Sequence, residues 1–210
     1  MSRFRKRHHH QTQPTTRAQW AAKLGEVART TTDQMLREHG LVQPPTVHML
    51  AEDMDQPYVG FITSRPYYRG SDAEQAITTL GLLPSVLPAT ALVVTWEHLD
   101  MCASVQLTTR DQPSLAVLDT PLAGDRPGYA PEHTLTWHRF DMHPGPANRD
   151  GAPTVRPTWH PPTTVANPPL PLPICCLLNW WRKSEQRDLK QTLLQLEQAG
   201  YRVRFAELTG

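Results

Sequence analysis

Cysteine is scarce in this chain of 210 residues, which contains only Cys102, Cys175 and Cys176. Two of the three are adjacent, and adjacent cysteines rarely form a disulfide with each other. No spaced, even-numbered set of cysteines exists that could staple a small secreted domain. We therefore expect the fold to depend on an ordinary hydrophobic core.

Long apolar runs are also lacking. The longest, residues 170–181, is interrupted by Pro171 and Pro173 and is too short to span a bilayer. Residues 8–19 are almost wholly polar, so no apolar segment of a signal peptide follows the basic start. We expect a cytoplasmic protein without a transmembrane segment. The excess of Arg over Lys, with abundant Pro and Thr, is typical of a GC-rich bacterial coding sequence.

Recognised catalytic fingerprints are missing as well. The sequence has no Walker-type glycine loop, no G-x-G-x-x-G, no H-E-x-x-H, no G-x-S-x-G and no C-x-x-C. Cys102 lies four residues after His98, so a Cys–His pair is one interpretation of this stretch. A small core residue on an amphipathic helix is the other, and we favour it. These absences favour a non-catalytic protein over an enzyme.

A strong net charge is absent too. The formal charge is +1, so the fold as a whole is not a polyanion binder. Basic residues nevertheless cluster within residues 3–10, and no carboxylate precedes Glu26. We expect residues 1–15 to form a disordered basic tail. Contact of residues 3–10 with nucleic acid would be weak and sensitive to salt, and a solubilising extension is the alternative.

The helix-like and strand-like segments of the sequence predict a single α+β or α/β domain. We expect a mixed sheet of about five or six strands covered by about three helices. The expected parts are a tail (1–15), a main body (16–143), a Pro-rich extended arm (144–173), and a C-terminal helix with a closing strand of the same domain (174–210). The arm is assigned because its frequent prolines exclude a regular helix or a central strand.

Helical spacing marks the first segment, residues 16–39, whose apolar stripe is followed by Gly40 as a helix-ending residue. The stripe consists of Trp20, Leu24, Val27, Thr31 and Met35. A second helix begins at a capping box formed by Ser71 and Glu74. It is expected to bury Ala73, Ala76, Ile77, Leu80 and Leu83.

A third helix is predicted near the end of the chain. Ser184 is the N-cap candidate, and Glu185 and Asp188 favour the positive helix N-terminus. The stripe of this helix consists of Leu189, Leu193 and Leu196. A short helix is also favoured at 99–107. Strand patterns occupy the remaining segments, 46–53 and 58–65 as a hairpin, then 91–98, 114–119, 133–143 and 201–208.

A Thr-Trp pair followed by an ionisable residue occurs at 95–97, 136–138 and 158–160. In a strand, each Trp and the residue after it point to opposite faces, so a buried Trp beside a solvated neighbour accounts for the pattern. The alternative is a site. His138, Asp141 and His143 would hold a divalent metal such as zinc or manganese, and Glu97, from the neighbouring strand, would orient water as a general base.

The loop from Arg65 to Gly70 places two arginines around two tyrosines, before a helix N-terminus. Arg65, Tyr67, Tyr68 and Arg69 could form a cradle for an anionic ligand. The favoured alternative is a turn whose arginines pair with acidic residues at the start of the helix.

Residues 168–183 join the proline arm to an apolar patch. We expect this segment to fold back and bury Ile174, Leu177, Leu178 and one Trp, because an exposed patch of this size would aggregate. The second interpretation is a protein contact through Trp180 and Trp181.

Three functions follow in order of preference. The first is a non-catalytic binding or accessory protein with a protein partner, contacting it through the Arg65–Arg69 loop and the Trp180–Trp181 region. No cofactor is expected for that function. The second is a metal-assisted hydrolase, with phosphoesters as one substrate class, built on His138, Asp141, His143 and Glu97. The third is a weak nucleic-acid binder acting through the tail.

Overall fold

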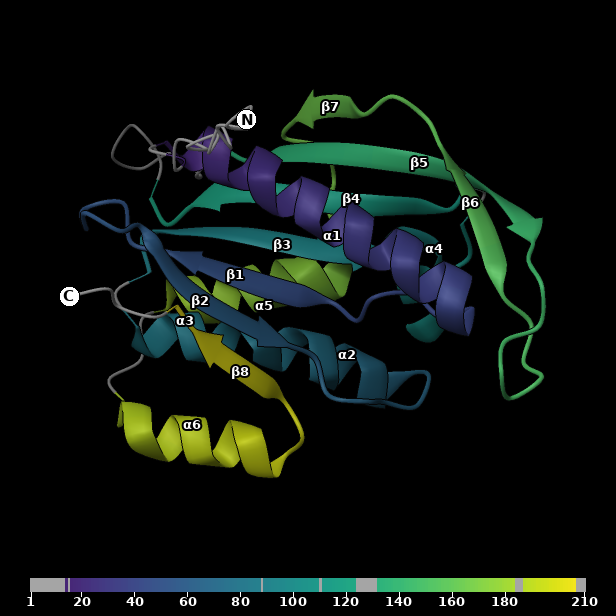
Figure 1. Ribbon diagram of the computed structural model, residues 1–210. Helices are drawn as coiled ribbons and strands as arrows, with labels where there is room; N and C mark the ends of the chain where they lie inside the picture. Colours follow the sequence, from purple (N-terminus) through teal and green to yellow (C-terminus); the bar gives the residue numbers. More distant parts are fainter. Residues whose placement is uncertain are drawn as a thin grey trace, which may run out of the picture.

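The computed structural model describes residues 14, 16–87, 89–109, 111–123, 132–183 and 187–206. Over these residues the chain forms one eight-stranded sheet with helices on both faces (Figure 1). Neighbouring strands follow the order β6-β5-β4-β3-β1-β2-β8, and β7 also pairs with β5. The strands are β1 (Thr46–Leu50), β2 (Tyr58–Thr63), β3 (Ala91–Glu97), β4 (Ser114–Pro121), β5 (Thr134–Pro144), β6 (Val155–Trp159), β7 (Thr163–Ala166) and β8 (Arg202–Phe205).

The α+β class is confirmed, but the sheet differs from the expected one. Every strand pair among the described residues is antiparallel, whereas a mixed sheet was expected. The sheet is also larger than five or six strands. The two extra strands, β6 and β7, lie inside the predicted proline arm. They pair with successive stretches of β5, residues 140–144 and 134–137.

The proline arm is therefore extended, as expected, but it forms ladder hydrogen bonds. Pro157 lies within β6, which pairs with β5 alone among the described strands. A proline lacks a backbone N–H and is tolerated where one side of a strand has no neighbour. Pro161 and Pro162 separate β6 from β7. The prolines divide the strand partner of β5 into β6 and β7 but do not prevent either from pairing with β5.

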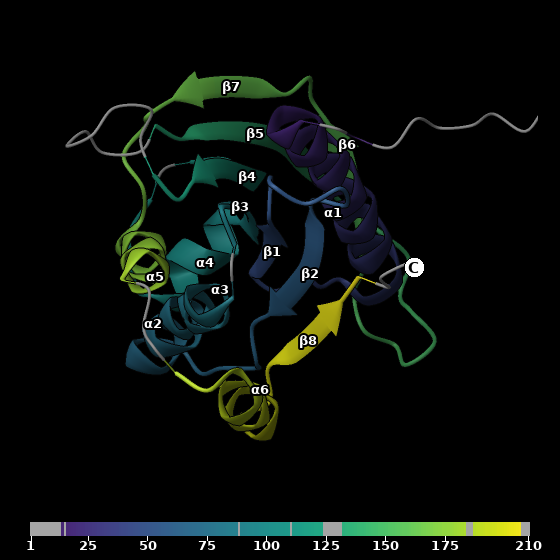
Figure 2. The same cartoon turned by 90° about the vertical axis from the view of Figure 1, so that its left-hand side faces the viewer.

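The helices divide between the two faces of the sheet (Figure 2). α1 (Arg17–His39) lies alone on one face, where it crosses β3, β4 and β6. The opposite face is covered by α2, α3 and α5, and α6 packs beside β8. The bounds are α2 (Ser71–Thr78), the 3-10 helix η1 (Thr79–Gly81), α3 (Leu82–Val86), α4 (His98–Ser104), α5 (Leu172–Arg182) and α6 (Leu189–Gln198).

The larger hydrophobic core lies on the face covered by α2, α3 and α5, which we call the three-helix face. The sheet contributes alternate residues such as Met49, Val94 and Trp96, all fully buried. α5 contributes Ile174, Leu177, Leu178 and Trp181, so the segment folds back as expected. The smaller core, on the face that α1 covers, includes Leu24, Ala28, Leu50, Ala91, Val93, Leu115 and Val117.

The bounds of α1 are close to the prediction, but its buried stripe is displaced. Thr16 caps the helix by accepting from the amide of Gln19, and Gly40 ends it with a φ of 68°. The buried positions are Leu24, Gly25, Ala28, Thr32 and Leu36. Val27, expected in the stripe, is 52% exposed. The face of α1 that meets the sheet is thus rich in small residues.

Two predicted caps are not the ones the structure uses. Gly70, not Ser71, is the N-cap of α2, and no side-chain hydrogen bond caps it. The five residues expected to be buried near this helix are all buried: Ala73, Ala76, Ile77, Leu80 and Leu83. In α6 the N-cap is Asp188, whose carboxylate accepts from the amide of Gln191. Ser184 and Glu185 lie outside the described residues.

Of the α6 stripe, Leu196 is buried, Leu193 is half-buried and Leu189 is exposed. Within the described part of the chain, no helix combines the length and apolar character needed to cross a bilayer.

Candidate functional site

A groove lies between the first half of α1 and the strands β4, β5 and β7. Its volume is about 380 Å³. α1 lines it with side chains no larger than a methyl group over most of its length: Ala18, Ala21, Ala22 and Gly25. The sheet supplies Val117, Asp119, Thr134, Thr136, His138 and Thr164. We call this space the α1 groove.

The groove follows from the spacing of small residues on α1. Residues 18, 21, 22 and 25 recur at three- and four-residue intervals, so they share one face of the helix. Alanine and glycine cannot reach across the space that separates a helix from a sheet. Leu24, next to Gly25, and Ala28, about one turn beyond Gly25, are buried against the sheet and close the space. The groove is therefore a local property of the first half of α1.

His138 is the central polar group of the α1 groove. Its side chain is only 6% exposed, and no hydrogen bond joins its ring to another described residue. A methyl group placed on Gly25 would lie 3.6 Å from Nε2 of His138, so the missing side chain of Gly25 leaves this nitrogen accessible. Burial lowers the pKa of His138, with Glu26 raising it and Arg29 lowering it further. This shift favours the neutral form of the ring.

Two ion pairs flank the α1 groove. Nε of Arg17 lies 3.0 Å from Oδ1 of Asp119, whose pKa is raised by burial and lowered by the arginine. Nη2 of Arg29 lies 2.9 Å from Oε2 of Glu26 and lowers the pKa of that carboxyl. Each carboxylate that lines the groove thus lies within ion-pair distance of a guanidinium, although Arg17 donates to Oδ2 of Asp119 and the buried Oδ1 accepts no hydrogen bond from a described residue. The ends of the groove are close to neutral.

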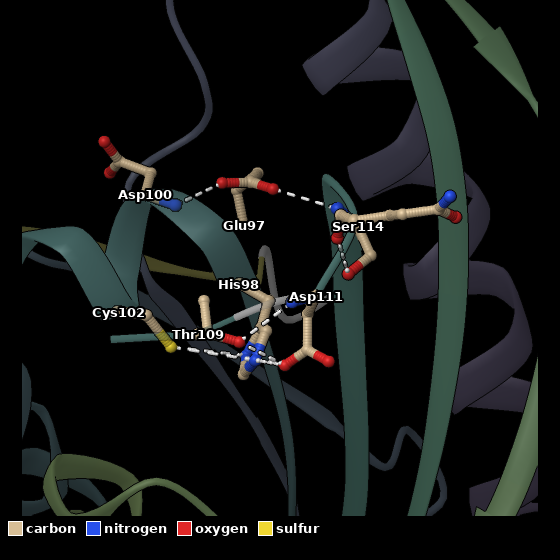
Figure 3. A network of polar contacts seen from close by, with 8 residues as sticks. Glu97, His98, Asp100, Cys102, Thr109, Asp111 and Ser114 are labelled. Atoms are coloured by element: carbon tan, nitrogen blue, oxygen red, sulfur yellow. Dashed lines mark hydrogen bonds and ion pairs between the residues drawn. The ribbon is translucent and has the colours of Figure 1, made fainter. Parts of the chain in front are cut away.

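A second, more polar pocket of about 500 Å³ opens beside the start of α4. It is lined by His98, Asp111, Gln112, Ser114, Trp137 and Arg139. Figure 3 shows the network next to it, in which Glu97 and His98 are the central groups. Oε2 of Glu97 accepts from the amide of Asp100 at 2.5 Å, and Oε1 accepts from the amide of Ser114 at 2.9 Å.

Glu97 is therefore a structural group. It is the N-cap of α4 and joins the end of β3 to the start of β4. Burial raises its pKa, and the backbone amides of Asp100, Ser114 and Leu99 oppose that shift. Both carboxylate oxygens accept backbone hydrogen bonds, an arrangement that fits a helix cap better than the general-base role predicted from the sequence.

His98, Cys102 and Asp111 come together as a Cys–His–Asp array (Figure 3). Nε2 of His98 lies 3.0 Å from Oδ2 of Asp111 and 3.6 Å from Sγ of Cys102, whereas Nδ1 lies 4.0 Å from the sulfur. A nucleophilic triad needs the thiol and the carboxylate on different nitrogens. The thiol is 4% exposed, and burial and Asp111 raise its pKa. This favours a core role for Cys102.

The predicted metal ligands are not brought together. Among the described residues no group of three or more His, Cys, Asp or Glu side chains is placed to hold a metal ion. His138 faces α1, whereas Asp141 is exposed and pairs with His160 at 3.0 Å. Glu97 is not on the strand next to β5, because Leu115 of β4 pairs with both Glu97 and His138.

His143 is exposed near the end of β5, where its backbone pairs with Arg156 of β6. It is an odd number of residues from His138 along the strand, so the two side chains point to opposite faces. The alternation argument made for the Thr-Trp pairs agrees with the register: Trp96 and Trp137 belong to the core of the three-helix face, and their neighbours face the other way.

The Arg65–Arg69 loop adopts the turn that was favoured over an anion cradle. Arg65 pairs with Asp72, which also accepts from the amide of Tyr68 at 2.7 Å. Tyr67 is half-buried against the core, and burial raises its pKa to about 12. Tyr68 is 85% exposed and Arg69 is exposed, so these two side chains remain available for a contact.

Trp181 is not available for a surface contact, because it is 1% exposed and donates from Nε1 to the carbonyl of Ala89. Trp180 is half-buried, packs against the same core and lies under the guanidinium of Arg187. The expectation of one buried Trp is confirmed, and it is Trp181. The predicted aromatic contact surface is reduced to part of Trp180.

The α1 groove was missed from the sequence. The signal was present as A18-x-x-A21-A22-x-x-G25, a stripe of small residues at helical spacing. A hydropathy pattern gives such a stripe little weight, because alanine and glycine bury little area. His138 was singled out, but as a metal ligand.

Comparisons with protein-family models, with curated proteins and with solved structures find no match for this chain.

Proposed function

We propose that the protein is a non-catalytic binding protein that holds a small organic molecule in the α1 groove. One observation carries this proposal: His138 is buried, has no hydrogen-bond partner among the described residues and faces a space lined by small side chains. The proposal keeps the function class preferred from the sequence and moves the site from the Arg65–Arg69 loop to α1.

The surroundings of His138 support a ligand site. The residue is largely buried, but its ring nitrogens are not sealed off and remain open to the groove. A ligand that bonds to His138 would replace solvent at the ring, and its apolar part would cover Val117 and the alanines of α1.

The size of the α1 groove also fits a ligand site. At about 380 Å³ it falls near the lower end of the range of small-molecule pockets, about 300–1,000 Å³. Its lining is mostly apolar with a few polar groups, which is the usual composition of such pockets. The polar pocket beside His98 is larger, but His98 already bonds to Asp111 there.

Filling the groove tests the proposal. Ala22 lines the groove and is exposed, so Ala22→Trp should occupy the space without disturbing the core. Thr31→Trp is the matched control, because Thr31 is an exposed position of α1 outside the groove. The probes are hexyl and octyl alcohols, ketones, amines and carboxylates, screened by ligand-observed NMR.

We expect at least one probe to bind the unchanged protein and the Thr31→Trp variant, and to lose binding to Ala22→Trp. The proposal fails if no probe binds, or if every bound probe is indifferent to Ala22→Trp. Circular dichroism of both variants establishes that the fold is retained.

A protein partner remains a second candidate, and it is favoured by Tyr68, whose side chain is 85% exposed beside the exposed Arg69. A large exposed aromatic next to an arginine is a common composition of interface hot spots. Tyr68→Ala with Arg69→Ala should abolish capture of that partner in a pull-down and leave thermal stability unchanged. Capture by the double variant at the unchanged level would remove this loop as the contact.

The nucleic-acid function depends on residues 3–10, which lie outside the described residues. It stays a prediction, as does the cytoplasmic location.

A further inference from the structure

We propose that the ligand of the α1 groove is an uncharged, unbranched aliphatic molecule with one terminal hydroxyl group, bound with its oxygen against His138. This inference rests on the proposed function, since it assigns a chemical class to the same site. Three properties of the groove lead to it: its charge, its length and the chemistry of His138.

The charge of the groove disfavours an ionic ligand. Its two carboxylates, Asp119 and Glu26, are already paired with Arg17 and Arg29. An ammonium group would compete with a guanidinium for either carboxylate, and a carboxylate ligand would compete with Asp119 or Glu26 for an arginine. A charged group placed against Val117 and the alanines of α1 without a free counter-ion would lose part of its hydration. A neutral ligand avoids this loss.

The length of the groove favours a chain over a compact ring. Thr134, Thr136 and His138 line it from alternate positions of β5, and four residues of a strand span about 13 Å. On the helix side the lining extends from Ala18 to Glu26, and eight residues of an α-helix span about 12 Å. Both walls therefore describe a space that is long compared with its cross-section. An extended hydrocarbon chain fills such a shape.

The polar group of the ligand is set by His138. A neutral imidazole has one nitrogen that donates and one that accepts. A hydroxyl group can also donate or accept, so it can bond to Nε2 whichever tautomer is present. The hydroxyls of Thr136 and Thr164 lie 3.0 Å from each other and bond mutually. Among the groove residues that form no hydrogen bond with a described residue, His138 is more buried than Thr134. The aliphatic chain would then extend from His138 toward Thr134.

Gly25 provides a variant that blocks the oxygen site alone. A methyl group at this position would meet Val117 at 3.4 Å and Nε2 of His138 at 3.6 Å, which are ordinary contact distances. Gly25→Ala therefore should fold normally and should occupy the position that the ligand oxygen needs. His138→Phe keeps a ring of similar shape and removes its hydrogen bonding.

The experiment is calorimetric titration of the full-length protein with 1-octanol, octylamine and octanoate at pH 7. We expect 1-octanol to bind about tenfold more tightly than either charged chain. The alcohol gains one net hydrogen bond and avoids the desolvation of a charge, and together these favour it by about that factor in Kd. Gly25→Ala and His138→Phe should each weaken 1-octanol by about tenfold, and Thr31→Trp should leave it unchanged.

The outcomes separate this inference from the proposed function. Tighter binding of octylamine or octanoate, weakened by Ala22→Trp, would overturn the hydroxyl ligand and retain the groove as a binding site. Binding of 1-octanol that is insensitive to Gly25→Ala and His138→Phe would also overturn it. Both proposals fail if Ala22→Trp weakens the binding of none of the three eight-carbon probes and of none of the wider probe set.

Discussion

The two faces of the sheet are built differently. On the three-helix face, α2, α3 and α5 meet the strands with large side chains, and Ile77, Leu83 and Trp181 are each at most 1% exposed. On the other face a single helix, α1, meets the same sheet with alanines and a glycine over its first half. Large side chains fill the space between helices and sheet on the first face. On the second face, the small side chains of α1 leave a groove open.

The difference indicates how the two faces divide stability and function. Burial of apolar area stabilises a fold in proportion to that area. The three-helix face therefore should supply most of the stability. The α1 face contributes less per residue, and it contains two buried histidines, His48 and His138. We expect substitutions to have effects of different size, and in one case of different sign, on the two faces.

The largest effect is expected from Trp181→Ala on the three-helix face. Removing this fully buried ring leaves a cavity and an unpartnered carbonyl at Ala89, which should lower the free energy of unfolding by about 4 kcal/mol. Trp20→Ala is the counterpart on α1, where the ring is half-buried and stacks on Tyr58 at 5.2 Å. It should cost less than half as much. Urea unfolding of both variants measures the difference, and equal losses would refute the contrast between the faces.

The next effect is a pH dependence that originates on the α1 face. Burial lowers the pKa of His48 to about 4. An unfolded chain binds a proton at this histidine below about pH 6.5, and the folded protein does not until about pH 4. The free energy of unfolding should therefore fall as the pH is lowered through this window, by about 3 kcal/mol at pH 4.

Carboxyl groups also titrate in that window, so the contribution of His48 is obtained from the difference between the unchanged protein and a variant without this histidine. His48→Phe removes the titrating ring and its hydrogen bond to Tyr58. Urea unfolding of both proteins at pH 7, 5.5 and 4 should show a shallower decline for the variant. Parallel curves would mean that His48 is not protonated differently in the two states.

A glycine substitution should be destabilising on the three-helix face. A methyl group at Gly81 would lie 2.2 Å from the carbonyl oxygen of Leu177, so α5 must move to admit it. Gly81→Ala should lower the free energy of unfolding by about 2 kcal/mol, a typical cost of overpacking. Differential scanning calorimetry provides the measurement, and an unchanged melting temperature would show that the contact between η1 and α5 is loose.

The same substitution on the α1 face should have the opposite sign and the smallest size. Gly25→Ala introduces only ordinary contacts and removes a glycine from a helix interior. It should raise the free energy of unfolding by about 0.5–1 kcal/mol. A loss of stability of similar size to that of Gly81→Ala would mean that Val117 and His138 do not accommodate the added methyl group.

The sequence predicted most of the elements because their patterns are local. β3 is a fully buried β-branched run, and Gly40 ends α1 at the expected residue. β6 and β7 were missed as strands, because prolines are excluded from central strands but not from edges. The mixed sheet was wrong for a different reason: whether a strand pairs parallel or antiparallel depends on its distant neighbours.

The candidate site was less predictable than the fold. The α1 stripe was assigned from hydropathy, which selected Val27, whereas the sheet contacts Gly25 and Ala28. An empty space depends on side-chain volume, and an apolar pattern does not report volume. The structure does not bring the residues of the metal hypothesis together, because His138 and His143 are an odd number of residues apart on β5 and point to opposite faces, as the alternation rule already implied.

The ring of His138 would report directly on a ligand that binds to this buried histidine in the α1 groove. Protein with ¹⁵N-labelled histidine would be titrated with 1-octanol, and the ring nitrogen resonances would be followed by NMR. The account predicts a saturable shift of the His138 resonances, weakened by Gly25→Ala and unaffected by Thr31→Trp. His138 resonances that stay fixed while those of other histidines shift would contradict it.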